Sequence, residues 1–319
     1  MSAAPLRVGT RRSPMAMTQA GLVGRAITAQ TGRDVELVGI ESAGDRSSAL
    51  LTQIGGTGVF VSSLRASLLA GEVDVAVHSL KDLPTGAAAG IALAAVPFRD
   101  DPRDALVTRD GAKLADLPLG ARVGTGSPRR AAQLLLLRPD IQTVPVRGNA
   151  GTRLAKVENG ELDALVLGCA GLARIGRLDA VAQVFEPDEM MPAAGQGALA
   201  VECNQAREGL VALLGAIDDP VSRAATTAER TMLGALQGGC AAPVGAYAGG
   251  TDVLRLDGLV VAVDGGMAVR GNASGPLAAA EVLGRQVAVD LLSRGAARCM
   301  AVSGSAGAGG QLTSGDDDK

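Results

Sequence analysis

The feature that most constrains the fold of this chain is an internal repeat. Residues 7–14 (RVGTRRSP) resemble residues 122–129 (RVGTGSPR), and residues 71–77 (GEVDVAV) resemble residues 160–166 (GELDALV). Each pair occupies corresponding points of a strand–helix series, which predicts two similar α/β lobes in one chain. Two such lobes usually enclose a cleft, and ligands favour the carboxyl ends of the strands.

Short apolar runs alternate with helical patterns in the first part of the chain. We expect strands at 6–10, 35–40 and 73–79 and helices at 13–30 and 60–70. Ser13 is the expected N-cap of the first helix, and Pro14 stands at its first position. Residues 73–79 form a continuous apolar run, which is typical of a strand buried on both faces. The alternation predicts a parallel α/β architecture.

Two proline-bounded breaks are candidate hinges, at 97–102 (PFRDDP) and 191–195 (MPAAG). Two crossings would let the chain return to the first lobe after the second break. A new α+β unit starts at 218–220 (DDP), with a helix over 221–236, a loop over 237–243, two or three strands and a last helix near 277–294. The expected division is a first lobe of 1–98 and 197–217, a second lobe of 99–196, a small domain of 218–303 and a disordered tail of 304–319.

Composition excludes several classes of function. Aromatic residues make up 1% of the chain, so the cores must consist of Val, Leu, Ile and Ala, and base-stacking platforms for nucleic acid are not expected. The net charge of −3 lacks the basic excess of a nucleic-acid binder. The amino-terminal residues lack the apolar region of a signal peptide, and no apolar run approaches the roughly 20 residues that span a bilayer. We therefore expect a cytoplasmic protein without a membrane partner.

Cysteine and histidine content argues against a metal site. The four cysteines, Cys169, Cys203, Cys240 and Cys299, have no zinc-ligand spacing, and His78 is the single histidine. We interpret His78 as a packed histidine at a strand end. Cys240 follows Gly238 and Gly239 in a loop, where a thiol can be exposed and reactive, although a small buried cysteine is the alternative.

Arginines follow several of the predicted strands. They are Arg11, Arg12, Arg129, Arg130, Arg147, Arg153 and Arg174. Strand ends and helix N-termini favour anions, and guanidinium groups pair bidentately with carboxylates. The pattern predicts a cleft that holds several carboxylates at once. The alternative for any single arginine is an ordinary solvated side chain.

Asp82 and Lys81 lie just past a predicted buried strand, within residues 78–84 (HSLKDLP). A carboxylate at the mouth of a cleft can stabilise a developing cation and exchange protons. The alternative is that Asp82 caps a turn. The glycines of residues 55–58 (GGTG) are a weaker signal, because the Lys-Ser/Thr of a phosphate-binding P-loop does not follow.

Taken together, seven segments resemble the porphobilinogen deaminase family over about residues 6–300. They are TRRSP (10–14), VHSLKDLP (77–84), DPRD (101–104), GTGSPRR (124–130), RGNAGTRL (147–154), PAAGQG (192–197) and GGC with its following proline (238–243). Seven matches in family order are a specific signal.

The resemblance implies two lobes like those of periplasmic binding proteins and a third domain whose cysteine, matched by Cys240, holds a dipyrromethane cofactor through a thioether. It implies a monomeric transferase of tetrapyrrole biosynthesis that joins four porphobilinogen molecules to this primer with loss of ammonia and releases hydroxymethylbilane by hydrolysis. The catalytic aspartate is matched by Asp82.

The resemblance also implies which side chains hold the pyrrole carboxylates. Besides Cys240, the implied cofactor-binding residues are Lys81, Ser79, Thr125, Ser127, Arg129, Arg130 and Arg153. The implied substrate-binding residues are Arg11, Ser13, Arg147, Arg153, Arg174 and Gln196. No metal is implied.

The chain departs from the family pattern at four positions. Gln53 and Thr57 stand in a lid-like loop where lysines are common, Pro128 replaces a usual leucine, and Gln237 replaces a frequent glutamate. Two other functions remain as alternatives: a two-lobed anion-binding protein without catalysis, and a transferase acting on phosphorylated substrates. The first does not explain the third domain, and the second lacks a phosphate or metal motif.

Overall fold

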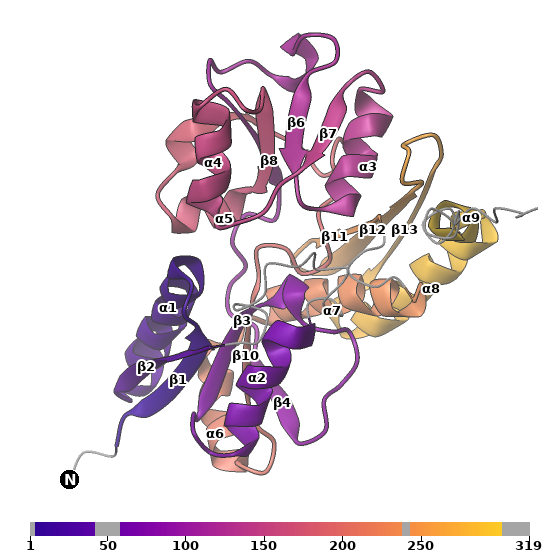
Figure 1. Cartoon of the computed structure of the whole chain (residues 1–319). Coiled ribbons are helices and arrows are strands. Elements are labelled where there is room, and N and C mark those ends of the chain that lie inside the picture. The colour runs from indigo at the N-terminus through magenta and orange to yellow at the C-terminus, as the bar shows by residue number, and fades with distance from the viewer. Residues whose placement is uncertain (1–3, 42–57, 238–242, 302–319) are drawn as a thin grey trace, which may run out of the picture.

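The computed structural model describes residues 4–41, 58–237 and 243–301 of the 319-residue chain. Three sheets organise these residues into two α/β lobes and a smaller third domain (Figure 1). In Figure 1 the first lobe is mostly indigo to purple, with β10 and α6 in salmon, the second lobe lies above it in magenta, and the third domain is orange to yellow. No helix among the described residues has the length and apolar character that crossing a membrane requires.

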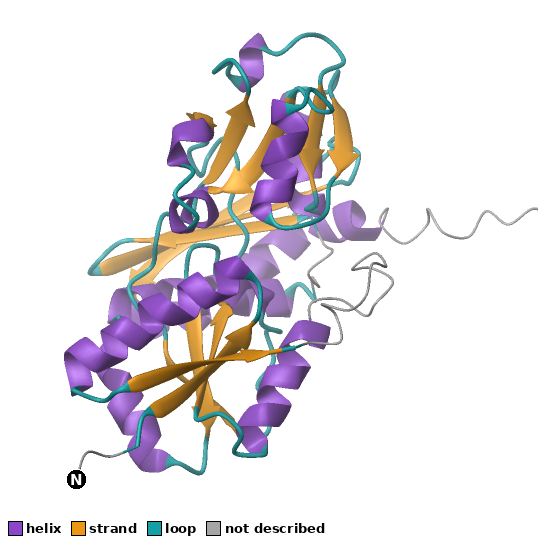
Figure 2. Cartoon of the chain, turned by 60° about the vertical axis from the view of Figure 1, so that its left-hand side comes forward, coloured by secondary structure: helices purple, strands orange, loops and turns teal. Residues whose placement is uncertain are grey.

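The first lobe is built on a five-stranded sheet of order β2-β1-β3-β10-β4. Its strands are β1 (Leu6–Arg11), β2 (Val35–Ile40), β3 (Val75–Ser79), β4 (Ile91–Ala95) and β10 (Leu199–Asn204). Its helices are α1 (Pro14–Thr31), α2 (Gly58–Leu69) and α6 (Glu208–Leu214). Helices α1 and α6 cover one face and α2 the other, which Figure 2 shows as helices on both sides of the lower sheet.

The second lobe repeats this plan strand for strand, in the order β7-β6-β8-β5-β9. Its strands are β5 (Asp104–Thr108), β6 (Arg122–Thr125), β7 (Gln142–Pro145), β8 (Ala164–Gly168) and β9 (Val181–Val184). Its helices are α3 (Pro128–Leu137), α4 (Ala150–Glu158) and α5 (Cys169–Arg174). Val8 of β1 pairs with Val75 of β3, as Val123 of β6 pairs with Ala164 of β8, so the duplication seen in the sequence is confirmed.

The α/β architecture is confirmed, but both sheets are mixed where the alternation of elements predicted parallel strands. Strand β10 runs antiparallel to both of its neighbours, β3 and β4. Strand β5 does the same between β8 and β9 in the second lobe. In each lobe the reversed strand follows a crossing from the other lobe. Its residues are almost all buried, a pattern that is compatible with parallel or antiparallel pairing. The apolar pattern predicts a buried strand but not its direction.

Aliphatic side chains fill the cores, as the composition predicts. Leu, Val, Ile and Ala dominate the core clusters on both faces of each sheet, and Phe185 is the single aromatic side chain among the fully buried ones in the described ranges. Helix α1 begins where expected: Ser13 accepts a hydrogen bond from the Ala16 amide at 3.3 Å, and Pro14 follows it. Cys169 is the first residue of α5.

The third domain packs helices against a three-stranded antiparallel sheet. Its elements are α7 (Pro220–Ala235), β11 (Val244–Gly249), β12 (Val253–Val261), β13 (Ala268–Pro276), α8 (Ala280–Ser293) and α9 (Ala296–Ala301). Helix α9 was not predicted, and α8 starts three residues later than 277 because a 3-10 turn (Leu277–Ala279) precedes it. The side chains of α7 and α8 form one apolar core with this sheet.

The two crossings between the lobes lie against each other. Arg99 of the first crossing donates through Nε to the carbonyl oxygen of Gln196 in the second, at 2.8 Å. Gly197 has a φ of 88°, and a Cβ there would collide with the carbonyl oxygen of Asp100. Glycine is therefore required at this point for both its conformation and its size.

We expect Gly197→Ala to lower the free energy of unfolding by about 1–3 kcal/mol, because alanine is strained at positive φ and its Cβ displaces the first crossing. Urea unfolding of the purified variant measures this. Gly209→Ala is the control: Gly209 lies in α6 with open space around it, so alanine should be neutral or stabilising by about 0.5–1 kcal/mol. Equal stability of both variants would contradict the role given to Gly197.

Candidate active site

The turn that carries Asp82 follows β3 directly. Strand β3 ends at Ser79, and the next three residues form a 3-10 turn, Leu80–Asp82. The Leu80 amide bonds to the Ala198 carbonyl at 3.0 Å, and the Leu83 amide closes the turn on the Leu80 carbonyl at 3.1 Å. Leu80 and Leu83 are buried, while Asp82 is partly exposed. The apolar residues thus anchor the turn and present its polar ones.

Two predicted arginines of the second lobe are buried around a carboxylate that the sequence analysis did not single out. Arg129 and Arg130 lie in the first turn of α3, where Ser127 is the N-cap. Arg129 Nη2 lies 2.7 Å from Oδ2 of Asp104, and Arg130 Nε donates to Oδ1 at 2.9 Å. Asp104 is fully buried, and the two arginines are nearly so. Two cations therefore share one carboxylate inside the protein.

Burial alone would raise the pKa of Asp104, but Arg129 and Arg130 outweigh it and lower the pKa to about 2. The single negative charge of Asp104 does not balance the two positive charges of Arg129 and Arg130. Burial lowers the pKa of Arg129, and its Nε is buried without a hydrogen-bond partner in the described part of the chain. An orphaned donor beside excess positive charge is the environment that an anionic ligand would complete.

Gln196 joins the two lobes at this point. Its Nε2 donates to Asp104 Oδ1 at 2.8 Å and to the Pro102 carbonyl at 2.7 Å. Its Oε1 accepts from Arg130 of the second lobe and from Lys81 of the first, both at 3.4 Å. The predicted residues Lys81, Arg130 and Gln196 are therefore brought together by one buried amide.

Lys81 is exposed at the lobe junction, and protein atoms crowd around its ammonium group. Partial desolvation lowers its pKa to about 8, and repulsion from Arg130 contributes, while Asp82 and Asp104 act in the opposite direction. A lysine held among arginines at a lobe junction favours negatively charged ligands.

Arg153 and Arg147 extend the cationic region along the second lobe. Arg153 lies in α4 and donates through Nε to the Gly148 carbonyl at 2.8 Å. Burial lowers the pKa of Arg153, and repulsion from Arg130 and Arg147 adds to the effect. Arg147 follows β7 and is exposed. The carboxyl ends of β6 and β7 are thus lined by at least four arginines.

The remaining predicted residues have structural partners of their own. Ser79 Oγ exchanges hydrogen bonds with the Gln19 amide at 3.0 and 3.2 Å, and Thr125 Oγ1 accepts from the Ser127 amide at 3.2 Å. Ser13 caps α1, next to Arg11 at the end of β1. This corner faces the second lobe, because the Met15 methyl group lies near Gly171 of α5.

Arg174 follows β8, as predicted, but it lies at the C-terminal end of a helix. It is the last residue of α5. It donates to Asp100 Oδ2 at 2.7 and 3.0 Å and to the Gly197 carbonyl at 2.7 Å, so it ties the second lobe to both crossings. Helix α5 starts directly after β8, so Arg174 lies at the far end of this helix and not at the end of the strand.

His78 is buried in β3, as expected for a packed histidine. Its Nε2 lies 3.2 Å from Glu202 of β10, which also accepts a bidentate pair of bonds from Arg65 of α2 at 2.6 and 3.0 Å. Burial would raise the pKa of Glu202, but His78 and Arg65 lower it to about 2. Glu202 and Asp104 were not among the predicted site residues, although an acidic residue in an apolar strand is a signal of a buried ion pair.

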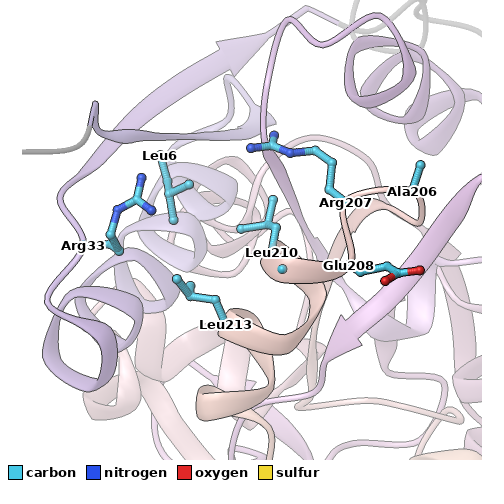
Figure 3. Close-up of a pocket in the computed structure, with 8 residues that line it drawn as sticks. Leu6, Arg33, Ala206, Arg207, Glu208, Leu210 and Leu213 are labelled. Carbon is cyan, nitrogen blue, oxygen red and sulfur yellow. The ribbon is translucent and has the colours of Figure 1, made fainter.

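A pocket also lies at the opposite end of the first lobe, near the start of β1 (Figure 3). Its volume is about 430 Å³, and its lining includes Leu6, Arg33, Arg207, Leu210 and Leu213. No predicted site residue lines it, and it lies at the amino end of β1, whereas ligands of such sheets bind at the carboxyl ends of strands. We therefore place the candidate site at the lobe junction around Lys81, Asp104 and Arg130.

Cys240 with Gly238 and Gly239, and Gln53 with Thr57, lie outside the described ranges. The glycine-rich residues 55–57 also lie outside them. Gln237, the last described residue before Cys240, has a φ of 52°. Within the described residues, no group of three or more His, Cys, Asp or Glu side chains is arranged to hold a metal ion.

We expect Asp104→Asn to lower the free energy of unfolding by about 3–5 kcal/mol at pH 7, because it leaves Arg129 and Arg130 buried without their counter-charge. The folded-state pKa of Asp104 is lowered to about 2, so its stabilisation is complete above the ordinary carboxyl pKa of 3.8 and is lost as the pH falls towards 2. Urea unfolding should therefore show the variant and the parent protein converging between pH 4 and pH 2.

Asp252→Asn, at an exposed position of the third domain, is the control and should change the free energy of unfolding by less than about 0.5 kcal/mol. A gap between Asp104→Asn and the parent protein that stays constant down to pH 2 would show that the charge of Asp104 is not what stabilises the cluster.

Two solved structures that resemble this chain do so distantly. The methionine binding protein MetQ is 13% identical with a TM-score of 0.44, covering 66% of this chain and 88% of its own. A periplasmic binding protein of Salmonella typhimurium with high arginine specificity is 17% identical with a TM-score of 0.40, covering 69% of this chain and 94% of its own. Likenesses of this strength carry no argument about the ligand.

Comparison of amino-acid sequences, by contrast, identifies the family. The family model for porphobilinogen deaminase, dipyromethane cofactor binding domain, matches residues 6–212, and the model for porphobilinogen deaminase, C-terminal domain, matches residues 224–293. Porphobilinogen deaminase of Thermobifida fusca is 58% identical over 311 residues, covering 94% of this chain and 97% of its own. Porphobilinogen deaminase 1 of Streptomyces coelicolor is 52% identical over 314 residues, covering 94% and 98%. The chain therefore belongs to the porphobilinogen deaminase family.

Proposed function

We propose that this chain is a transferase that joins four porphobilinogen molecules, one after another, to a covalently held dipyrromethane, with loss of ammonia, and releases hydroxymethylbilane by hydrolysis. The observation that carries the proposal is the excess of positive charge where the lobes meet. Arg129 and Arg130 pair with a single buried carboxylate, Asp104, and Lys81 is joined to the same cluster through Gln196. Each pyrrole of this series brings two carboxylates, an acetate and a propionate, so a pyrrole chain supplies the missing negative charge.

The residues present fit a dipyrromethane at this junction. Its four carboxylates match the orphaned Nε of Arg129 and the mutually repelling Arg130, Arg153 and Lys81. Ser79, Thr125 and Ser127 supply hydroxyl groups on the same edges of the sheets. When bound, the dipyrromethane supplies the pyrrole carbon to which the first substrate molecule is joined.

Cys240 is the proposed attachment point. The other three cysteines are buried, and burial raises the pKa of Cys169 to about 11 and raises those of Cys203 and Cys299 as well. Such thiols stay protonated and are poor nucleophiles.

Asp82 is the proposed catalytic residue. The carboxylate holds the positive charge that develops at the substrate's pyrrole nitrogen when ammonia leaves, and it accepts the proton that is lost when the new bond is complete. Lys81 and Gln196 orient carboxylates beside it. Arg11, Ser13, Arg147, Arg153 and Arg174 are proposed to hold the incoming substrate and the growing chain.

We further propose the division of the chain into lobes of 1–98 with 197–217 and of 99–196, followed by a domain of 218–303 and a tail of 304–319. The pairing of β10 with β3 and β4 supports the return of the chain to the first lobe. One chain supplies both sides of the junction, which supports a monomer. We propose a cytoplasmic location, with porphobilinogen as the partner and neither nucleic acid nor membrane.

We expect the intact mass of the purified protein to exceed the chain mass by that of two linked pyrroles, and Cys240→Ala to abolish this excess. Mass spectrometry of the two proteins tests it. Cys203→Ala, which removes a buried thiol, is the control and should keep the added mass. An unmodified parent protein that stays unmodified after incubation with porphobilinogen would refute the proposed function.

We expect Asp82→Asn to keep the fold and the added mass but to lose turnover by about 10²–10⁴-fold, the usual contribution of a proton-transferring group. The measurement is kcat for hydroxymethylbilane formation, compared with Asp116→Asn, an exposed carboxylate of the second lobe. Near-normal turnover in Asp82→Asn would remove Asp82 from the mechanism.

A further inference from the structure

Arg230 of the third domain donates hydrogen bonds to the main chain of the turn that carries Asp82. From α7, its Nη1 donates to the carbonyl oxygens of Leu80 at 3.2 Å and Leu83 at 3.0 Å, and its Nη2 donates to that of Pro84 at 2.6 Å. These three carbonyls stand on both sides of Asp82 in the sequence. The turn is therefore held from outside its own lobe.

The turn has few bonds of its own. Within the described residues, its amides make one internal bond, from Leu83 to Leu80, and one bond to Ala198. Pro84 has no amide hydrogen, and the burial of Leu80 and Leu83 limits the access of water to their carbonyls. A planar guanidinium has five N–H donors in a fixed fork and can bond to three carbonyls at once. The ammonium group of lysine has all its donors on one nitrogen and cannot span the same carbonyls.

The helix that presents Arg230 is itself fixed. The neighbouring Glu229 is fully buried and accepts bonds from Arg99 at 2.6 Å, from the Gly195 amide at 2.7 Å and from the Ala248 amide at 2.8 Å. A Cβ at Gly234, one turn further along α7, would lie 3.3 Å from Thr85 Oγ1. The end of α7 and the segment after Asp82 are thus packed side by side.

Helix α7 ends at Ala235, and Cys240 follows five residues later. The helix consequently connects the Asp82 turn with the segment that carries Cys240. We propose that Arg230 is a positioning residue, which fixes the Asp82 carboxylate relative to the third domain and hence to the pyrrole chain attached there. This inference rests on the proposed roles of Asp82 and Cys240.

A second arginine of α7 provides a matched control. Arg223 lies two turns before Arg230 and donates to the carbonyl oxygens of Leu93 at 3.3 Å and Ala94 at 3.1 Å in β4. It also ties the third domain to main-chain oxygens of the first lobe, but at a strand that carries no proposed site residue. If Arg230 only held the domains together, both arginines would behave alike.

The experiment compares Arg230→Lys with Arg223→Lys in holoenzyme whose cofactor has been verified by mass. For Arg230→Lys we expect kcat to fall by about 10–100-fold, because a small displacement of the carboxylate is costly, while KM changes by less than about threefold. For Arg223→Lys we expect kcat within about twofold of the parent protein at a comparable loss of melting temperature. A parental kcat in Arg230→Lys, or equal losses in both variants, would overturn the proposal.

Arg230→Lys in the Asp82→Asn background completes the test. If Arg230 acts through Asp82, its replacement should cost less than about twofold there. Losses that multiply would show an independent role and overturn the proposal. Parental turnover in Asp82→Asn alone would instead refute the role of Asp82. If neither Arg230→Lys nor Arg230→Gln gives folded holoenzyme, the role of Arg230 is structural and the proposal fails.

Discussion

The buried carboxylate of Asp104 is the interaction on which the candidate site depends. It is the first residue of β5, the reversed strand of the second lobe, and it fixes Arg129, Arg130 and Gln196 around itself. Desolvating a charge costs several kcal/mol unless partners surround it, and here the partners exceed it in number. One carboxylate thus organises two guanidinium groups and still leaves the region positive.

That surplus makes the protein and its ligand complementary. The lowered pKa values of Lys81 and Arg153 show that each cation is destabilised by its surroundings before any ligand is present. Carboxylates bound among these groups would relieve both the repulsion and the unmet hydrogen-bonding of the Arg129 Nε. A site that works by charge needs no aromatic platform, which is consistent with a chain whose cores are almost wholly aliphatic.

Local patterns predicted local structure well. The repeat, the Ser13 cap and the turn after β3 each depend on a few neighbouring residues, and each is present where the sequence placed it. What the sequence could not show is which distant groups meet. Arg130 and Asp104 are 26 residues apart, and Arg230 lies 150 residues from Leu80. The direction of β10 could not be predicted for a different reason, since a buried strand has the same apolar pattern in either direction.

The duplication also explains why both lobes are needed. Strands β3 and β8 occupy equivalent places, but β3 leads into the turn with Asp82, whereas β8 leads into α5 with Arg174. The first turn of α3 carries Arg129 and Arg130, whereas that of its counterpart α1 carries no charged residue. In the proposed site, one lobe therefore contributes Asp82 and the other contributes most of the buried cations. Neither copy alone supplies all residues of the proposed site, and the amide of Gln196 is bonded to Lys81 on one side and Arg130 on the other.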